Sequence, residues 1–373
     1  MIDPVLFFNK LRQGGIGLFT GVPDSLLKHF CAYLEDHCQA SGHVITANEG
    51  NAVALAAGYH LATGKVAAVY MQNSGLGNAV NPLLSLADQE VYSIPLLLVI
   101  GWRGDPGIKD EPQHVKQGRI TAGLLDQMEI PCYVLDSDSN YNQVVDSVLD
   151  KITITNAPAA LLVRKNTFAP YTKNKSCEPL STLSREEALT EILTLADENT
   201  LVVSTTGKTS REVFEIRARH GQPQHDFLTV GSMGHTASIA LGVALGNPQK
   251  RVLCLDGDGS ALMHLGSLSV IGELKPANLV YILLNNNAHE SVGGQPTAAV
   301  RFNFAVMAKA CGFSQFRQAE TLAELREGWA DISDKPGPQM IEVRICPGSR
   351  DDLGRPTCTP EENKNAFMEQ AID

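Results

Sequence analysis

The amino-acid sequence predicts an α/β fold of two doubly wound domains, each built on a parallel sheet. Short aliphatic or β-branched runs alternate with helical patterns along the whole chain, which is typical of this class. With 373 residues, the chain is too long for one ordinary domain and suits two. A polar stretch without periodicity interrupts the alternation near residue 180 and separates the two domains.

The predicted strands are aliphatic runs that are too short for helices. In the first half they are Gly17–Thr20, His43–Ala47, Val66–Met71, Leu96–Ile100, Cys132–Leu135 and Ala160–Val163. The second half repeats the rhythm with Thr200–Ser204, Asp226–Val230, Val252–Asp256, Leu279–Asn285 and Met340–Ile345. Because helical patterns fill the intervals, we expect the strands of each domain to be parallel.

The segment Pro170–Leu183 (PYTKNKSCEPLSTL) is polar, contains prolines and is interpreted as a linker. A capping box then opens the next helix, with Ser184 at the N-cap and Glu187 at N3. We therefore predict a first domain over residues 1–172 and a second over residues 184–373.

Composition and charge exclude several classes of protein. Hydrophobic residues make up 43% and charged residues 19%, which is typical of a folded globular chain. Lys and Arg number 30 against 41 Asp and Glu, and the net charge of −11 argues against nucleic acid as a partner. No apolar run has the length of a membrane span, and residues 1–20 lack a signal-peptide pattern. The 8 cysteines include no C-x-x-C pair, so we expect reduced thiols in a cytoplasmic protein.

Three glycine-containing turns give weak signals by themselves. Met71–Asn78 (MQNSGLGN) lacks the third glycine and the ribose-binding acid of a nicotinamide-nucleotide fingerprint. Thr205–Lys208 (TTGK) lacks the spacer of a P-loop. Val230–His235 (VGSMGH) precedes an Ala- and Gly-rich helix, and close packing alone explains its small residues.

Two polar strand ends give a more specific signal. Leu255–Ser260 reads LDGDGS after one hydrophobic run, and Leu283–Asn287 reads LLNNN at the end of another. Asn286 follows Asp258 by 28 positions (286 − 258), which is enough for a helix and a strand and places both side chains on adjacent strand ends. Carboxylate and carboxamide oxygens suit Mg²⁺, and the glycines let backbone N–H groups approach a phosphate. An ordinary Asp-Gly turn and an unrelated Asn cluster are the alternative.

This pattern resembles the thiamine-diphosphate-dependent decarboxylases, whose signature is G-D-G followed further along by N-N. Here the motifs are Gly257-Asp258-Gly259 and Asn285-Asn286. Ala47–Gly58 (ANEGNAVALAAG) resembles the family's catalytic-glutamate helix, and Ser74–Gly101 resembles the segment after it. The resemblance covers both halves and implies a pyrimidine-binding domain followed directly by a diphosphate-binding domain, without the middle domain of many relatives.

The resemblance implies thiamine diphosphate and Mg²⁺ as cofactors. It assigns the metal to Asp258, the side chain of Asn286 and the backbone oxygen of Ala288. Glu49 is expected to bond to the aminopyrimidine ring and promote loss of the proton at C2 of the cofactor; the alternative is an acid favoured by the helix dipole alone. Further cofactor contacts are expected from Thr206, Gly207, Ser232, Met233, Gly257, Gly259 and Ser260.

Unusual strings, among them Gly21–Lys28 (GVPDSLLK) and Ala288–Thr297 (AHESVGGQPT), resemble the branch of this family that acts on phosphonopyruvate. That likeness implies formation of phosphonoacetaldehyde and CO₂, a step of phosphonate biosynthesis. Sulfopyruvate or another 3-substituted pyruvate is the alternative substrate. A catalytically silent α/β binding protein is an alternative of another class, which the presence of Glu49, Asp258 and Asn286 disfavours.

A substrate with a carboxylate and a phosphonate needs fixed cations, and Arg binds a phosphonate bidentately. The candidates for substrate binding are Ser25, Arg103, Lys109 and Arg355, and those for delivering a proton to the enamine are Asp24, Ser25, His114 and His289. Arg355 lies in Ser349–Pro360 (SRDDLGRPTCTP), which we expect to order over the substrate. The alternative is a surface tail whose arginines pair with Asp351 and Asp352.

The resemblance also implies a homo-oligomer. In this family the site combines the first domain of one subunit with the second domain of another, and Glu49 and Asp258 lie in different predicted domains. We therefore expect a dimer or a larger assembly, with no nucleic-acid or membrane partner.

Overall fold

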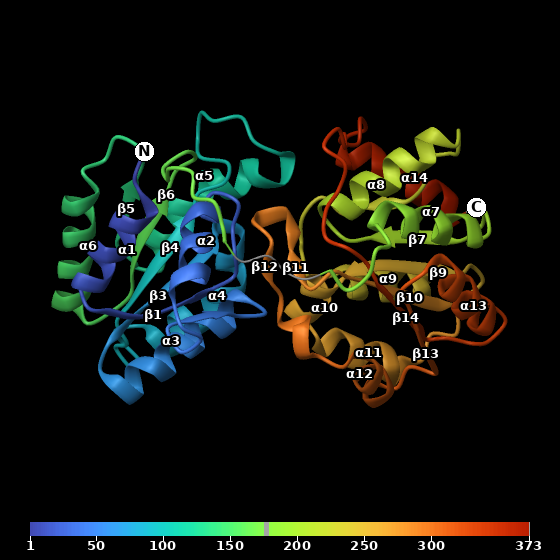
Figure 1. Ribbon diagram of the computed structural model, residues 1–373, viewed down its shortest axis with the longest axis horizontal. Helices are drawn as coiled ribbons and strands as arrows, with labels where there is room; N and C mark the ends of the chain where they lie inside the picture. The colour runs from blue at the N-terminus through green and yellow to red at the C-terminus, as the bar shows by residue number, and fades with distance from the viewer. Residues whose placement is uncertain (175–178, 373) are drawn as a thin grey trace. The chain divides into compact units, whose positions relative to one another are not determined.

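The computed structural model describes residues 1–174 and 179–372, which form two compact units. The first comprises residues 1–174 and 291–295, and the second comprises residues 179–290 and 296–372 (Figure 1). The domain bounds 1–172 and 184–373 stay a prediction. Residues 175–178 of the predicted linker, Cys177 included, and residue 373 lie outside the described residues.

The first unit contains a six-stranded parallel sheet in the order β2-β1-β3-β4-β6-β5. Each strand overlaps a predicted one: β1 (Ile16–Gly21), β2 (His43–Ile45), β3 (Val66–Gln72), β4 (Leu96–Gly101), β5 (Cys132–Leu135) and β6 (Ala159–Val163). The helices are α1 (Pro4–Gln13), α2 (Lys28–His37), α3 (Glu49–Thr63), α4 (Leu76–Pro82), α5 (Pro112–Gln127) and α6 (Tyr141–Thr155). Two short turns, η1 (Asn73–Gly75) and η2 (Leu83–Ala87), flank α4.

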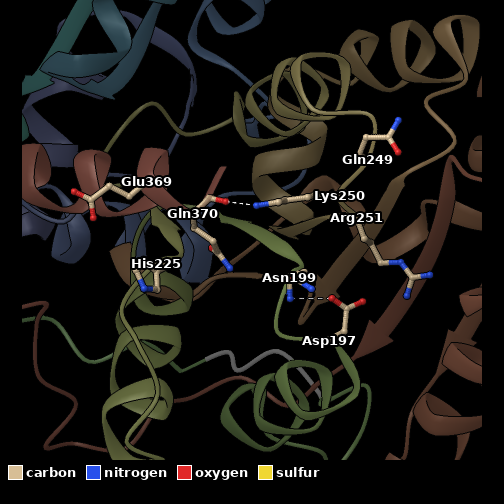
Figure 2. Close-up of a pocket in the computed structure, with 8 residues that line it drawn as sticks. All are labelled: Asp197, Asn199, His225, Gln249, Lys250, Arg251, Glu369 and Gln370. Carbon is tan, nitrogen blue, oxygen red and sulfur yellow. Dashed lines mark hydrogen bonds between the residues drawn. The ribbon is translucent and has the colours of Figure 1, made fainter. Parts of the chain in front are cut away.

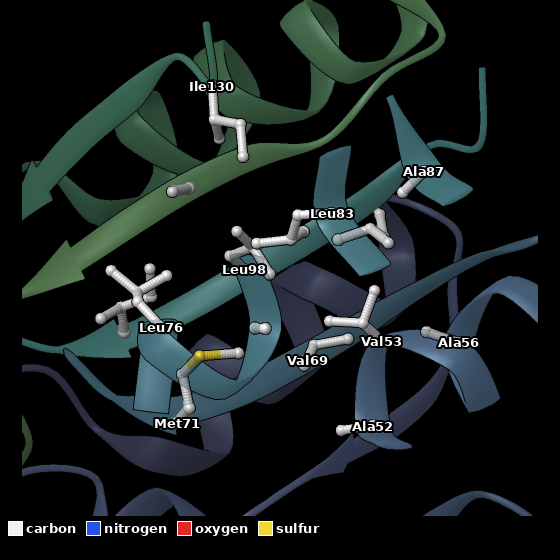
Figure 3. Packing of buried hydrophobic residues seen from close by; sticks show 14 of the residues in the cluster. Ala52, Val53, Ala56, Val69, Met71, Leu76, Leu83, Ala87, Leu98 and Ile130 are labelled. Atoms are coloured by element: carbon white, nitrogen blue, oxygen red, sulfur yellow. The ribbon is translucent and has the colours of Figure 1, made fainter. Parts of the chain in front are cut away.

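Hydrophobic side chains pack on both faces of this sheet, because successive residues of a strand point to opposite faces. On β3, Val69 and Met71 belong to one core cluster, whereas Ala68 and Tyr70 belong to the other. Figure 3 shows the first cluster, to which α3 contributes small side chains such as Ala52. Burial on both faces explains why these strands are continuous aliphatic runs in the sequence.

The second unit contains a six-stranded parallel sheet in the order β13-β14-β10-β9-β7-β8. Its strands are β7 (Leu201–Ser204), β8 (Phe227–Leu228), β9 (Val252–Gly257), β10 (Leu279–Asn285), β13 (Gln315–Ala319) and β14 (Gln339–Arg344). Its helices are α7 (Arg185–Leu195), α8 (Lys208–Arg219), α9 (Thr236–Gly246), α10 (Asp258–Met263), α11 (Gly266–Leu274), α12 (Phe304–Cys311), α13 (Leu322–Ser333) and α14 (Pro360–Ile372). The segment 288–296 forms a hairpin of β11 (Ala288–His289) and β12 (Gln295–Pro296).

The edge strand β13 departs from the sequence prediction. Its sequence, QFRQA, contains no aliphatic run, and most of its residues are partly exposed. It becomes a strand by pairing with β14, where Phe316 lies opposite Met340. The two doubly wound parallel sheets confirm the predicted fold class, and the predicted capping box of Ser184 and Glu187 opens α7.

The parallel strands of each sheet direct their carboxyl ends, and the loops that follow them, to one edge. In the second unit, Asp258 and Asn286 follow β9 and β10 directly. In the first unit, Asp24 and Glu49 lie after β1 and β2. Across the two described stretches of chain, no helix combines the length and apolar character that crossing a membrane requires.

Candidate active site

The ends of β9 and β10 place the predicted metal ligands on neighbouring strands. Leu284 of β10 pairs with Gly257 of β9, so Asp258 follows this pair by one residue and Asn286 follows it by two. Asp258 begins α10, is only 3% exposed, and accepts hydrogen bonds from the hydroxyl of Thr297 and the backbone of Asn286. These donors are neutral, and burial raises the pKa of Asp258 to about 6 in spite of them.

The donor set at these strand ends fits Mg²⁺. The Asp258 carboxylate, the Asn286 carboxamide and the Ala288 carbonyl offer hard oxygens, and all three residues are buried. A buried carboxyl with a raised pKa favours a cation that would stabilise its charged form. Among the described residues, no three His, Cys, Asp or Glu side chains converge as a metal site.

The predicted cofactor loops of the second unit are joined by hydrogen bonds. The hydroxyl of Ser260, in the first turn of α10, accepts from the Thr205 hydroxyl at 3.2 Å and from the Gly234 N–H at 3.1 Å. Thr206 and Gly207 lead into α8, and Gly207 (φ 93°) occupies its N-cap position. The glycine thus supplies a left-handed turn that leaves its N–H and those of the first turn of α8 available to an anion.

Gly259 lies where three side chains meet. A Cβ placed on Gly259 would come within 3.4 Å of Met233 Cε and His289 Cε1, and within 3.3 Å of Thr297 Cγ2. Burial lowers the pKa of His289 to about 4, so its imidazole is neutral at pH 7. Ser232 precedes Met233 in a left-handed conformation (φ 52°). The structure therefore brings Met233, Gly259 and His289 together, and adds Thr297, whose hydroxyl has no recognisable signal in the sequence.

Glu49 is the first residue of α3 and is 6% exposed. The Asn48 side chain caps this helix by accepting a hydrogen bond from the Asn51 N–H, which fixes the backbone position of Glu49 in the first turn. The amide of Asn78, on α4, donates to Glu49 Oε2 at 2.7 Å. Gly75 approaches from the other side, where an added Cβ would lie 2.4 Å from Glu49 Oε1. The glycine of the MQNSGLGN turn thus makes room for the Glu49 carboxylate.

The contact with Gly75 leads to a testable prediction. We expect Gly75→Ala to displace the Glu49 carboxylate and lower kcat by at least about tenfold, because a misplaced catalytic group loses rate steeply. Steady-state kinetics checks kcat, and Gly77→Ala is the matched control, since a Cβ on Gly77 meets open space. Equal kcat values for the two variants would show that Gly75 has no such role.

Asp24 and Ser25 follow β1. Asp24 is fully buried; its Oδ2 accepts from the Leu26 N–H at 2.9 Å, while Oδ1 has no hydrogen-bond partner within the described part of the chain. Burial raises the pKa of Asp24 to about 6. Ser25 Oγ accepts from an η-nitrogen of Arg103 at 3.0 Å. The structure thus places Arg103 beside the two predicted residues of this turn.

Arg103 is already engaged by an acid that the sequence analysis did not select. Asp110 accepts from Arg103 Nε at 2.8 Å and from its Nη2 at 2.5 Å, and it also accepts from the Gly104 N–H. Its pKa is lowered by Arg103 against the opposing effect of burial. His114, on α5, is buried, which lowers its pKa to about 4, whereas Lys109 is exposed.

The C-terminal segment is anchored on α8. Arg211 donates to the carbonyls of Leu353 and Gly354 at 2.7 and 2.6 Å, and Gly354 N–H donates to Glu215. Arg350 pairs with Glu215, Glu186 and Asp352. The side chain of Arg355 is exposed. The pairing with a local acid that the alternative interpretation expected is therefore seen for Arg350, together with bonds to residues of two helices, α7 and α8.

A surface hollow of about 940 Å³ lies at the opposite edge of the second sheet (Figure 2). Asn199 and Arg251 in its wall stand just before β7 and β9, at their amino ends. Lys250 spans it to the Gln370 carbonyl. Since ligands of open α/β sheets collect at the carboxyl ends, this hollow is distinct from the candidate active site.

The sequence of each unit, including the polar loops described above, matches a known family of protein domains. Residues 5–130 match the N-terminal thiamine pyrophosphate binding domain of thiamine pyrophosphate enzymes, and residues 205–343 match the C-terminal one. The chain belongs to the thiamine pyrophosphate enzymes. The enzyme therefore uses thiamine diphosphate (thiamine pyrophosphate), and the matched regions contain Glu49 and Asp258 respectively.

Full-length relatives refine this assignment. The enzyme is 36% identical to phosphonopyruvate decarboxylase of Streptomyces viridochromogenes, over 95% of this chain and 91% of that one. It is also 36% identical to the phosphonopyruvate decarboxylase of Streptomyces hygroscopicus, over 96% and 92%. Sulfopyruvate decarboxylase of Methanosarcina acetivorans is 27% identical over 96% and 95%. The enzyme thus belongs to the decarboxylase branch, and its resemblance to that branch is confirmed.

Proposed function

We propose that the enzyme decarboxylates phosphonopyruvate to phosphonoacetaldehyde and CO₂, with Mg²⁺ beside thiamine diphosphate, as a step of phosphonate biosynthesis. The observation that carries this proposal is the 36% identity to a phosphonopyruvate decarboxylase over 95% of the chain, which includes both groups of polar loops. Thiamine diphosphate, when bound, supplies an electron sink for the carbanion that forms as CO₂ leaves.

Residues of the second unit would hold the cofactor and its metal. Asp258, Asn286 and the Ala288 carbonyl offer oxygens to Mg²⁺. Backbone N–H and hydroxyl groups would bind the diphosphate, and Met233 would pack against the cofactor rings. The residues proposed for these contacts are Thr206, Gly207, Ser232, Met233, Gly257, Gly259 and Ser260.

Residues of the first unit would handle protons. Glu49, held by Asn78, would keep a proton on the aminopyrimidine ring. Asp24 has a pKa raised to about 6 and so retains a proton closer to neutral pH than an ordinary carboxyl does, which favours it as an acid. His114 and His289 have pKa values lowered to about 4 and are neutral at pH 7, which favours Asp24 over them for delivering a proton.

Substrate anions would meet Ser25, Arg103, Lys109 and Arg355. Arg103 has its charge balanced by Asp110, so its contribution would be a directed hydrogen bond beside Ser25 rather than a free cation. Lys109 and Arg355 are exposed and would supply positive charge to the phosphonate.

Substrate discrimination tests the proposed function. The pure enzyme with thiamine diphosphate and Mg²⁺ is given phosphonopyruvate, sulfopyruvate or pyruvate, and CO₂ release is followed. We expect the highest kcat/KM with phosphonopyruvate. A preference for sulfopyruvate would favour the second candidate function, which the 27% identity to sulfopyruvate decarboxylase supports. No CO₂ from any of the three acids would overturn both.

Arg355 offers a prediction on substrate binding. Arg355→Ala should raise KM for phosphonopyruvate by about ten- to a hundredfold, because a hydrogen bond to a charged group contributes about 1.5–3 kcal/mol. Pyruvate, which has no phosphonate, should show little change, and the affinity for thiamine diphosphate should stay constant. Steady-state kinetics with both acids checks this prediction. An equal rise in KM for both acids would show that the C-terminal segment has a structural role only.

Self-association is proposed on the family resemblance and on exposed leucines. Leu61 of α3 is 73% exposed and Leu245 of α9 is 53% exposed, and neither helix contains a basic residue other than His60. We expect a dimer or larger species in light scattering at micromolar concentration, with activity falling as dilution dissociates it. A fully active monomer would contradict this expectation.

A further inference from the structure

Glu290, two residues after Ala288, connects the metal loop to two helix starts. Its Oε1 accepts from Lys208 Nζ at 2.7 Å, and its Oε2 accepts from Arg185 Nη1 at 2.9 Å. Lys208 is the first residue of α8 and Arg185 is the first residue of α7. The Glu290 carboxylate thus bonds to two cationic side chains, each carried by the first residue of a helix.

One of the cations that hold Glu290, Arg185, is itself held by a second acid. Arg185 is 6% exposed, and its Nε and Nη2 donate to both oxygens of the buried Glu212 at 2.7 and 2.8 Å. The Glu290 side chain is 11% exposed and forms ion pairs with both Arg185 and Lys208. Two acids and two bases therefore balance, and Glu290 is confined to one position.

That position controls the amide of Asn286. Asn286 Nδ2 donates to Glu290 Oε2 at 3.0 Å, and its Oδ1 accepts from the Ala288 N–H at 3.0 Å. A carboxylate only accepts hydrogen bonds, so the amide must present its nitrogen to Glu290 and its oxygen elsewhere. A metal ion binds the oxygen alone, so the orientation of this amide decides whether Asn286 is a usable ligand.

We propose that Glu290 is a positioning residue that turns the carboxamide oxygen of Asn286 toward Mg²⁺ and ties this loop to the diphosphate turn ahead of Lys208. The inference rests on the proposed function, because it takes Asn286 as a metal ligand. Glu290 itself binds neither the metal nor the cofactor. Partners that orient metal ligands in this way typically change metal affinity by about 10- to 100-fold when they are removed.

A double-mutant comparison tests the proposal, with Mg²⁺ titrated into protein and thiamine diphosphate and binding followed by intrinsic fluorescence or calorimetry. Glu290→Ala should weaken Mg²⁺ binding by about 10- to 100-fold. In the Asn286→Asp background the same change should weaken binding by less than about threefold, because a carboxylate presents an oxygen whichever way it turns. If Glu290→Ala does not fold, Glu290→Gln replaces it in the test. We then expect the same difference in Mg²⁺ affinity between the two backgrounds, but a smaller one.

The matched control is Glu191→Ala. Glu191 also accepts two charged hydrogen bonds, in its case both from Arg326, at 2.7 Å each, and it lies on α7 away from the metal loop. Mg²⁺ affinity should not change in this variant. Equal losses for Glu290→Ala in both backgrounds would mean a general structural role and would overturn the proposal, as would no loss at all. Wild-type protein without Mg²⁺-dependent cofactor binding would overturn the proposed function as well.

Discussion

Glu49→Gln should bind thiamine diphosphate within about threefold of the wild-type affinity and lose at least about a hundredfold in kcat. General acid–base groups contribute about 10²–10⁴-fold to a rate, and an amide cannot exchange the proton that a carboxylate shares. Asn78 can still donate its hydrogen bond to the amide oxygen of the variant, so the local structure should persist. Binding and turnover therefore separate in this variant.

The measurement pairs a cofactor titration with steady-state kinetics on phosphonopyruvate. Glu90→Gln, at an exposed position of the same unit, is the matched control and should keep wild-type values for both. A Glu49→Gln enzyme with near-normal turnover would remove Glu49 from the catalytic assignment. Loss of cofactor binding together with turnover would instead indicate that the carboxylate only holds the cofactor.

Asp258→Asn should abolish Mg²⁺-dependent cofactor binding and yet stabilise the cofactor-free protein at neutral pH. Burial raises the pKa of Asp258 from 3.8 to about 6, so the folded protein holds a proton over a range in which the unfolded chain has released it. Stability therefore falls as the pH rises from about 4 to about 6 and stays lower above that range. Two pKa units correspond to about 3 kcal/mol, which is the upper limit of the gain from the substitution at pH 7.5.

Thermal unfolding at pH 4.5 and at pH 7.5 checks the stability arm. The melting temperature of the Asp258→Asn variant should exceed that of the wild type at pH 7.5, and the gap should shrink at the lower pH. Added Mg²⁺ and thiamine diphosphate should raise the wild-type Tm and leave that of the variant unchanged. Asp331→Asn, an exposed position, is the control. A variant that still binds the cofactor in a Mg²⁺-dependent way would contradict the metal assignment.

The sequence by itself determined the fold class and the central polar residues. A strand that is buried on both faces of a parallel sheet, such as β4, can be recognised from the sequence alone, because every side chain in it must be apolar. Asp258 and Asn286 were predictable because each directly follows such a run, and the carboxyl ends of adjacent parallel strands meet.

Other features were decided by tertiary structure alone. The half-exposed edge strand β13 depends on pairing with β14, and its sequence contains no aliphatic run from which a strand could be predicted. Three contacts join residues that are separated in the sequence. Asp110 bonds to Arg103 across 7 positions, Asn78 to Glu49 across 29, and Thr297 to Asp258 across 39. Which polar side chain meets which depends on how loops cross the edge of a sheet, and that path leaves no periodicity in the sequence. Which residues are buried can therefore be predicted from the local sequence. The hydrogen-bond partners of each functional group are set only when distant loops come together in the folded protein.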